Sequence, residues 1–206
     1  MITVLAVSDH PTRLAALRTD LEAVRLFPDQ PDQLAEVDRL REIHSHTIAG
    51  IYLKHPPIPV REFTCFAFAL GLVTWRQSAI LLSQPVRPII SQAFLSDVLS
   101  ESVEVLAGDA TNGTVAIYQV GDEFVHAGIV HEGRIRSKWG NGYLWEHGEF
   151  EIPLDYGSTI RHFNVPGKMR ITDILRRHAE QQLAESERSF QAAVEQMRAR
   201  LRPVSD

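Results

Sequence analysis

Cysteine is nearly absent from this sequence, because Cys65 is the only one in 206 residues. A single cysteine cannot form an internal disulfide, and it cannot supply a CxxC metal site. The chain therefore carries no sign of an oxidising compartment. It has to fold by burying apolar residues, which make up 44% of the sequence, and at this length a core of sufficient size can form.

Long hydrophobic runs are absent too. No stretch approaches 18 uninterrupted apolar residues, so we expect no transmembrane helix and no membrane partner. The apolar residues 2–7 have no basic leader and are followed at once by Ser8, Asp9, His10 and Pro11, which is untypical of a secretory signal peptide. We expect a cytoplasmic protein, and delivery by a signal-independent secretion system is the open alternative.

An excess of positive charge is also missing, since the formal net charge is −5. Nucleic-acid binding needs a basic face, so we expect no nucleic-acid partner. No phosphate-binding glycine motif occurs, which argues against a nucleotide cofactor. The one HxH motif, at His44 and His46, would point its imidazoles about 200° apart on a helix and could not chelate one metal. We therefore expect neither a metal nor another cofactor.

Three regions of the sequence differ in the spacing of their apolar residues. Residues 1–60 form a predicted N-terminal helical extension, with apolar residues at helical spacing over 11–24 and 31–48. Its end is stiffened by a proline-rich segment at 56–59. Residues 166–206 return to helical spacing as a predicted C-terminal amphipathic helix. Its apolar stripe consists of Ile171, Leu175, Phe190, Val194, Met197 and Leu201.

The mixed charges beside this stripe usually mark a solvated helix face. The alternative is an oligomer or partner contact through the stripe. Residues 61–165 form the predicted catalytic core, of class α+β. Helices are predicted over 64–77 and 85–106, and the first is apolar all round, as a central helix is. Strands are predicted over 113–119, 124–130, 134–139, 149–153 and 159–163.

Cys65 lies at the predicted start of the central helix. The free backbone N–H groups and the dipole at a helix N-terminus favour a thiolate over a thiol. The same N–H groups could receive an oxyanion after the sulfur attacks a carbonyl carbon. Thr64 is a plausible N-cap residue, which would begin the helix at this point. Cys65 is therefore the candidate nucleophile.

His126 is the candidate base, on the second predicted strand. If Glu132 and Gly133 form a two-residue turn, Gly128 faces Ser137 and His126 faces Trp139 across the hairpin. Ser137 could then accept a hydrogen bond from the imidazole, and Trp139 could shield it from water. A three-residue turn would shift the register and bring Lys138 to the site instead.

Structural roles are the competing interpretation of each candidate. A lone cysteine in an apolar helix is usually a small core residue. A histidine on a strand is more often a structural group whose hydrogen bonds are satisfied. Trp139, Tyr143 and Trp145 either wall a substrate cleft or pack as core aromatics beneath the sheet.

Two segments resemble the NlpC-type papain-like hydrolases. Residues 64–71 (TCFAFALG) are similar to the nucleophile helix of that family, and residues 124–130 (FVHAGIV) are similar to its base strand. Gly108-Asp109 is similar to the Gly-Asp element of the family, with four further residues before the strand. The resemblance covers about residues 50–165. It implies a papain-like core in which the Cys-bearing helix packs on an antiparallel sheet.

The resemblance also implies a third polar residue, about a dozen positions after the base. Ser137 and Lys138 occupy those positions, in place of the usual His, Asn, Gln or Glu. His147, Ser137 and Asn141 are the candidates, in that order. Tyr52 matches the offset of an oxyanion-side tyrosine in some members. Thr64, Trp139 and Trp145 complete the predicted substrate-binding residues.

Residues 136–140 and 144–147 resemble a bacterial branch of papain-like proteins more closely than the secreted wall hydrolases. The expected function is therefore a thiol hydrolase, a peptidase or amidase, that cleaves an amide bond of a peptide or isopeptide-like substrate. Cys65 would form the acyl-enzyme and His126 would act as general base. A catalytically silent interaction module is one alternative, and an acyl or amine transferase with the same two residues is another.

Overall fold

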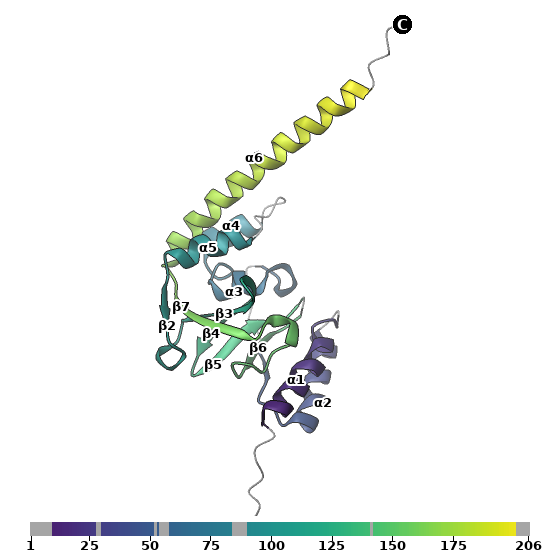
Figure 1. The fold of residues 1–206 in the computed structure, drawn as a ribbon, viewed down its shortest axis with the longest axis vertical. Helices are drawn as coiled ribbons and strands as arrows, with labels where there is room; N and C mark the ends of the chain where they lie inside the picture. Colours follow the sequence, from purple (N-terminus) through teal and green to yellow (C-terminus); the bar gives the residue numbers. More distant parts are fainter. Residues whose placement is uncertain are drawn as a thin grey trace, which may run out of the picture.

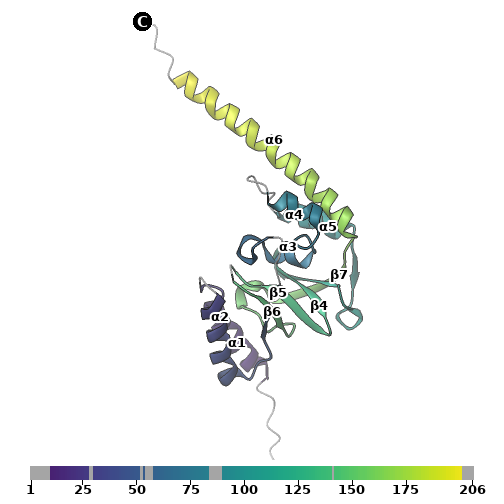
Figure 2. The ribbon, with the colours of Figure 1, turned by 180° about the vertical axis from the view of Figure 1, so that it is seen from behind.

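The computed structural model describes residues 10–27, 30–51, 53, 58–83, 90–140 and 142–200. Seven strands form one antiparallel sheet in the order β1-β6-β5-β4-β3-β7-β2. Helices α1 and α2 pack at one face of this sheet, and α3, α4, α5 and the start of α6 lie at the other (Figures 1 and 2). The predicted α+β class is confirmed. Among the described residues, none of the helices combines the length and the apolarity needed to cross a bilayer.

The two N-terminal helices form where the apolar spacing predicted them. Helix α1 is His10–Val24 and α2 is Gln30–His44, and their buried leucines and valines pack against the sheet. The second helix ends before residue 48, because Ser45 takes a left-handed backbone conformation with φ 53°. The chain then enters the edge strand β1, Ala49–Ile51, which the sequence analysis did not predict.

The predicted central helix is two helices, so the range 64–77 was wrong as a single element. Helix α3 is Cys65–Ala69 and α4 is Arg76–Leu82. Gly71 separates them with φ 69°. The N–H groups of Gly71 and Leu72 bond back to the carbonyls of Phe68 and Ala67, at 2.9 and 3.0 Å. This is a Schellman motif, which ends a helix at a glycine.

The second predicted helix is also shorter than expected. Helix α5 is Gln92–Ser100, and residues 84–89 lie outside the described part of the chain. Residues 103–105, predicted as helix, form strand β2 (Val103–Val105) on the sheet edge beside β7. The long helix α6, Lys168–Arg200, confirms the C-terminal helix.

Four neighbouring strands of the sheet match the sequence prediction closely. They are β3 (Val115–Val120), β4 (Glu123–His131), β5 (Arg134–Lys138) and β7 (Thr159–Asn164). The strand predicted over 149–153 does not form. The strand that follows β5 in the chain is instead β6, Leu144–His147. Residues after it turn instead, because the Glu151 carboxylate accepts the Gly148 N–H at 2.8 Å. A short 3₁₀ helix, η3 (Leu154–Tyr156), follows.

The β4–β5 hairpin has the register that the sequence predicted. Glu132 and Gly133 both have positive φ, at 51° and 74°, as a two-residue type I′ turn requires. His131 therefore faces Arg134, and Gly128 faces Ser137. Since side chains alternate along a strand, His126 faces α1 and α2 and Ala127 faces α3. The alternation is interrupted before His126, where the pairing with β3 shifts register. Val125 accordingly packs on the α1/α2 side with Tyr118, and Phe124 packs on the α3 side with Ala127.

Gly128 leaves no room for a side chain. A Cβ atom there would lie 2.4 Å from Ile135 Cγ2 and 2.9 Å from the Arg136 carbonyl oxygen. We expect Gly128→Ala to lower the free energy of unfolding by about 1–3 kcal/mol, because the hairpin must shift to accept the methyl group. Urea denaturation measures the change. Gly108→Ala is the matched control, since nothing lies within 4 Å of its added Cβ; equal loss in both variants would contradict the prediction.

Candidate functional site

Cys65 is the first residue of α3, as predicted. Thr64 precedes it in an extended conformation, and its hydroxyl oxygen accepts the Ala67 N–H at 3.2 Å. Thr64 is thus the N-cap residue, as predicted from its type and position. The helix has only five residues, because Gly71 stops it. The thiol is therefore held at the start of a single short turn packed on β4 and β5.

Three backbone N–H groups near the Cys65 sulfur act on its pKa. They belong to Cys65 itself, to Phe66 and to Ala127 of β4, and each lowers the pKa of the thiol. Burial of the sulfur acts in the opposite direction and is the largest effect. It raises the pKa of Cys65 from its ordinary value to about 11. The predicted preference for thiolate is therefore wrong in this structure, since desolvation outweighs the N–H groups.

His126 precedes Ala127, whose N–H acts on the sulfur, but the His126 side chain is on the other face of the sheet. The peptide that joins His126 to Ala127 supplies one of the three N–H groups. The imidazole is fully buried, and its ring stacks on Tyr156 with centroids 3.9 Å apart and planes 4° apart. Neither ring nitrogen has a hydrogen-bond partner among the described residues. The predicted thiol–imidazole hydrogen bond is thus not formed here.

Burial also governs the protonation of His126. It lowers the pKa of the imidazole well below the ordinary value, and the neighbouring His147 and Lys138 lower it further. The imidazole is therefore neutral at neutral pH. Two buried nitrogens without partners are costly, and such groups in native proteins call for an explanation beyond packing.

The third-residue candidates bond to each other and leave His126 without a partner. The Trp139 indole N–H donates to Ser137 Oγ at 3.0 Å, and the Ser137 hydroxyl donates to His147 Nε2 at 2.8 Å. His147 Nδ1–H in turn donates to the Gly148 carbonyl oxygen at 2.7 Å. The prediction that Ser137 bonds to His126 is therefore wrong, and His147 has no nitrogen left for that role. Its place on β6 depends on a strand that the sequence analysis did not predict.

The two tryptophans predicted to bind substrate are core residues. Trp139 and Trp145 are fully buried, and their rings stack with centroids 5.2 Å apart. Tyr143 meets Trp145 edge-on at 5.8 Å. They pack with the leucines and valines of α1 and α2. The prediction that they line a substrate cleft is therefore wrong. The alternative interpretation, that they are core aromatics beneath the sheet, is confirmed.

The sequence analysis brought Lys138 to the site only if the hairpin had a three-residue turn. The turn has two residues, yet Lys138 faces α3, since it alternates with Ser137. Its side chain is buried, its Nζ donates to the Gly140 carbonyl oxygen, and Nζ lies 5.7 Å from the Phe63 ring centroid. Burial lowers the pKa of Lys138 to about 8, while Cys65 raises it. No carboxylate of the described residues lies within 4.0 Å of Nζ. Lys138 is thus a buried cation next to the thiol.

Tyr156 was missed by the sequence analysis altogether. It stacks on His126, and its hydroxyl oxygen accepts the Gly140 N–H at 2.9 Å. Burial raises the pKa of its phenol well above the ordinary value, with Cys65 as the next contribution. Tyr156 comes from η3, about 30 residues after the base, and a tyrosine in such a loop gives no local signal. Tyr52 and Asn141, two further predicted residues, lie outside the described residues.

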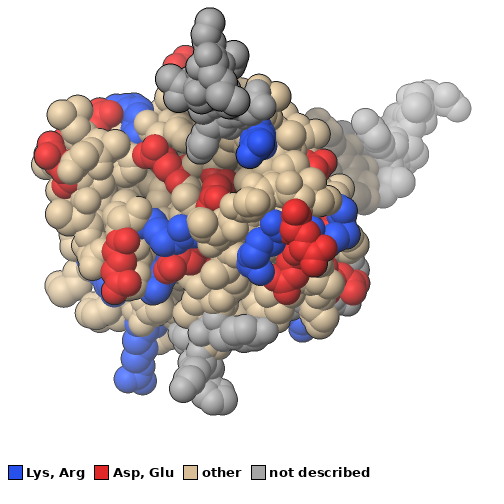
Figure 3. Space-filling model, turned by 90° about the horizontal axis from the view of Figure 1, so that it is seen from below, with Lys and Arg blue, Asp and Glu red and all other residues tan. Residues whose placement is uncertain are grey.

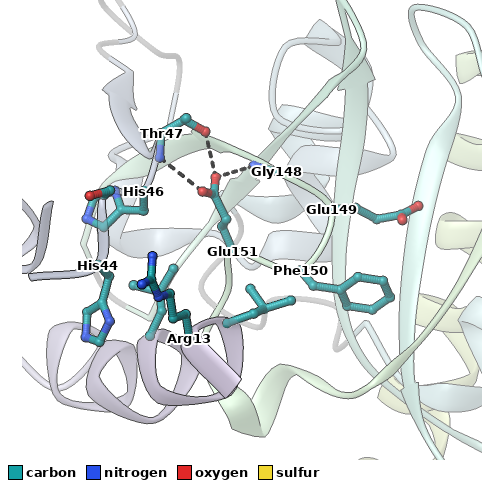
Figure 4. Close-up of a pocket in the computed structure, with 11 residues that line it drawn as sticks. Arg13, His44, His46, Thr47, Gly148, Glu149, Phe150 and Glu151 are labelled. Atoms are coloured by element: carbon teal, nitrogen blue, oxygen red, sulfur yellow. Dashed lines mark hydrogen bonds between the residues drawn. The ribbon is translucent and has the colours of Figure 1, made fainter. Parts of the chain in front are cut away.

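A separate cavity of about 500 Å³ opens beside α1 (Figure 4). Its polar floor is fixed, because the Glu151 carboxylate accepts hydrogen bonds from Thr47 N, Thr47 Oγ1 and Gly148 N. None of the predicted site residues lines it. On the molecular face of Figure 3, acidic and basic side chains are interleaved and form no patch of one sign. Within the described ranges, no group of three or more His, Cys, Asp or Glu side chains could hold a metal ion.

Comparison with known proteins gave no similarity: no family model matches the sequence, and neither a curated protein nor a solved structure matches the chain. The chemical interpretation of the site therefore depends on its own geometry.

The pKa of His147 predicts acid sensitivity. Burial lowers it to about 4, against an ordinary value near 6.5. Between pH 6.5 and 4, the His147 imidazole is protonated in the unfolded chain but not in the folded chain. The free energy of unfolding therefore decreases as the pH falls from 6.5 towards 4. At about 1.4 kcal/mol per pH unit, the loss from this residue is roughly 3 kcal/mol.

Urea denaturation of the wild type and of His147→Gln at pH 7.0 and at pH 4.5 measures this loss. The variant is expected to be less stable at pH 7, because the Ser137–His147–Gly148 bonds are altered, but to lose less stability on acidification. The same pH dependence in both proteins would show that His147 does not titrate in this way.

Proposed function

We propose that this protein is a cysteine hydrolase with a papain-like core that cleaves an amide bond through a Cys65 acyl-enzyme. One observation carries the proposal: the thiol lies at the start of α3, packed on β4, where three backbone N–H groups favour its charged form, and one of these belongs to the peptide that joins Ala127 to the buried, unbonded His126. The nucleophile and the oxyanion donors thus lie on one face of the sheet, and the proposed base is the next residue along β4, with its side chain on the other face. The substrate class is a peptide or another amide-containing molecule.

The reaction starts from a neutral thiol and a neutral imidazole. The sulfur attacks the amide carbonyl carbon, the S–C bond forms, and the thiol proton passes to His126. The N–H groups of Cys65, Phe66 and Ala127 then stabilise the oxyanion. The C–N bond breaks as the imidazolium gives its proton to the leaving amine. Water, deprotonated by His126, cleaves the thioester, which releases the carboxylic acid and restores the thiol.

His126 has to leave its stack on Tyr156 to take part in this proton transfer. Catalytic hydrogen bonds are often long or misaligned without substrate and tighten when it binds. The imidazole loses no hydrogen bond when it moves, since it makes none within the described structure. Because the ring lies on the face of the sheet away from the sulfur, rotation of the side chain alone does not bring it there. The movement has to include the β4 backbone at His126, where the pairing with β3 shifts register.

A p-nitrophenyl ester tests the proposal without knowledge of the natural substrate, because the acyl group transfers to any activated thiol. We expect wild-type protein to release a burst of p-nitrophenol equivalent to the protein concentration. Cys65→Ala should give no burst, and His126→Gln should slow it by roughly 10²–10⁴-fold. His178→Ala is the control, because that histidine lies on α6 and bonds to Asp97, away from the sulfur.

The raised pKa of Cys65 also suits the second candidate function, a catalytically silent interaction module. That module would lack the burst, although Cys65 would still react with iodoacetamide at high pH. Its biological effect would survive in Cys65→Ala. An acyl or amine transferase would give the burst, and added amine would then shorten the lifetime of the acyl-enzyme. The same assay thus separates the three activities.

Lys138 is proposed to stabilise the thiolate whenever it forms. It is a buried cation beside Cys65, and opposite charges in a site of low dielectric favour each other. We expect Lys138→Met, which keeps the length of the stem, to slow iodoacetamide labelling of Cys65 by roughly three- to tenfold at pH 8.5. Lys168→Met is the control, since Lys168 begins α6 beside Gly71. Unchanged labelling in Lys138→Met would remove this role.

A further inference from the structure

The second half of α6 has no support from the body of the protein. Ile171, Ile174 and Leu175 are buried in the core, and His178 bonds to Asp97 of α5 at 2.9 Å. Beyond this point the helix runs away from the sheet into open space (Figures 1 and 2). A polar helix of this length is only marginally stable alone in water, so its structure calls for a partner.

Three large apolar side chains on this free segment are exposed at intervals of seven residues. Leu183, Phe190 and Met197 are 57%, 66% and 61% exposed. Val194 lies four residues after Phe190, so these residues alternate in steps of three and four, as the a and d positions of a coiled coil do. Glu187 is the single polar residue among them. Glu185, Arg188 and Glu195 occupy the opposite face.

Over 184–193 the residues that flank this seam are small or uncharged, and Arg198 and Arg200 follow at the equivalent positions. In the same heptad, the positions beside the seam hold Ala184, Ser186, Gln191 and Ala193. Charged e and g positions usually select the partner, and their absence over 184–193 removes repulsion between two identical helices in this central part. The free segment can therefore approach a copy of itself closely.

We propose that two copies of this chain associate through the free segment of α6 as an antiparallel coiled coil. Helix α6 carries three acidic residues over 180–187 and two arginines at its end, Arg198 and Arg200. Antiparallel pairing places the acidic part of one helix beside the basic part of the other. Parallel pairing would instead place like charges together and would bury Glu187 against Glu187 of the other copy, which is unfavourable.

The register follows from the seam. Phe190 packs against Val194 of the second copy, and the two-fold axis crosses the seam midway between these two residues. The two sheets then lie at opposite ends of the paired helices, which avoids any clash between the bodies. The Cys65 sites stay apart in this dimer, so the association does not depend on the proposed hydrolase activity.

Light scattering on the purified full chain over a range of micromolar concentrations tests the association. We expect twice the chain mass of 23.2 kDa. Phe190→Glu should give the single-chain mass, because it places a charge in the seam. Ala192→Glu, on the exposed opposite face of the same helix, should leave the dimer intact. A monomeric wild type, or a dimer that survives Phe190→Glu, would overturn the proposal.

Disulfide crosslinking in a Cys65→Ala background tests the orientation. Gln191→Cys lies near the two-fold axis of the antiparallel pair and should crosslink to itself under mild oxidation. Leu183→Cys should not, because in this register it lies far from Leu183→Cys of the second copy. Self-crosslinking of Leu183→Cys without that of Gln191→Cys would establish a parallel pair and contradict the antiparallel arrangement.

Discussion

The contact between the start of α3 and strand β4, where the Ala127 N–H acts on the Cys65 sulfur, joins the two halves of the site. It places the start of α3 against strand β4, at the peptide bond between His126 and Ala127. The alternation of β4 then decides which groups face which layer. His126 turns towards α1 and α2, while Ala127 and, on β5, Lys138 turn towards α3. The two-residue turn at Glu132 and Gly133 sets this arrangement, and a slip of one residue would exchange the faces.

Burial, more than charge pairing, controls the protonation of the site. It raises the pKa of Cys65 and lowers the pKa values of His126, His147 and Lys138. Every one of these shifts favours the neutral form of the group, as desolvation does. Thiol and imidazole are thus both neutral at rest, and the site differs from a preformed thiolate–imidazolium pair. Reaction would require a proton to move only when a carbonyl group is in place.

Sequence reasoning succeeded where the signal is local. The Thr64 cap, the turn at Glu132-Gly133 and the facing of Gly128 by Ser137 each depend on a few neighbouring residues, and each is confirmed. It failed where distant segments decide. Ser137 bonds to His147 because β6 lies beside β5, and no feature near Ser137 indicates this. The helix dipole suggested a low thiol pKa, but the depth of burial could not be known from the sequence.

The N-terminal helices, predicted as an extension, turn out to be part of the site. The buried guanidinium of Arg18 on α1 donates to the carbonyl oxygens of Ile152 and Leu154, each at 3.3 Å, and to that of Gly157. These bonds hold the loop that carries Tyr156, and Tyr156 covers the His126 ring. Because Arg18 satisfies three carbonyls at once, displacing this loop is costly. Access to the imidazole therefore depends on a contact made some 110 residues earlier in the chain, which no inspection of the residues around Cys65 and His126 could reveal.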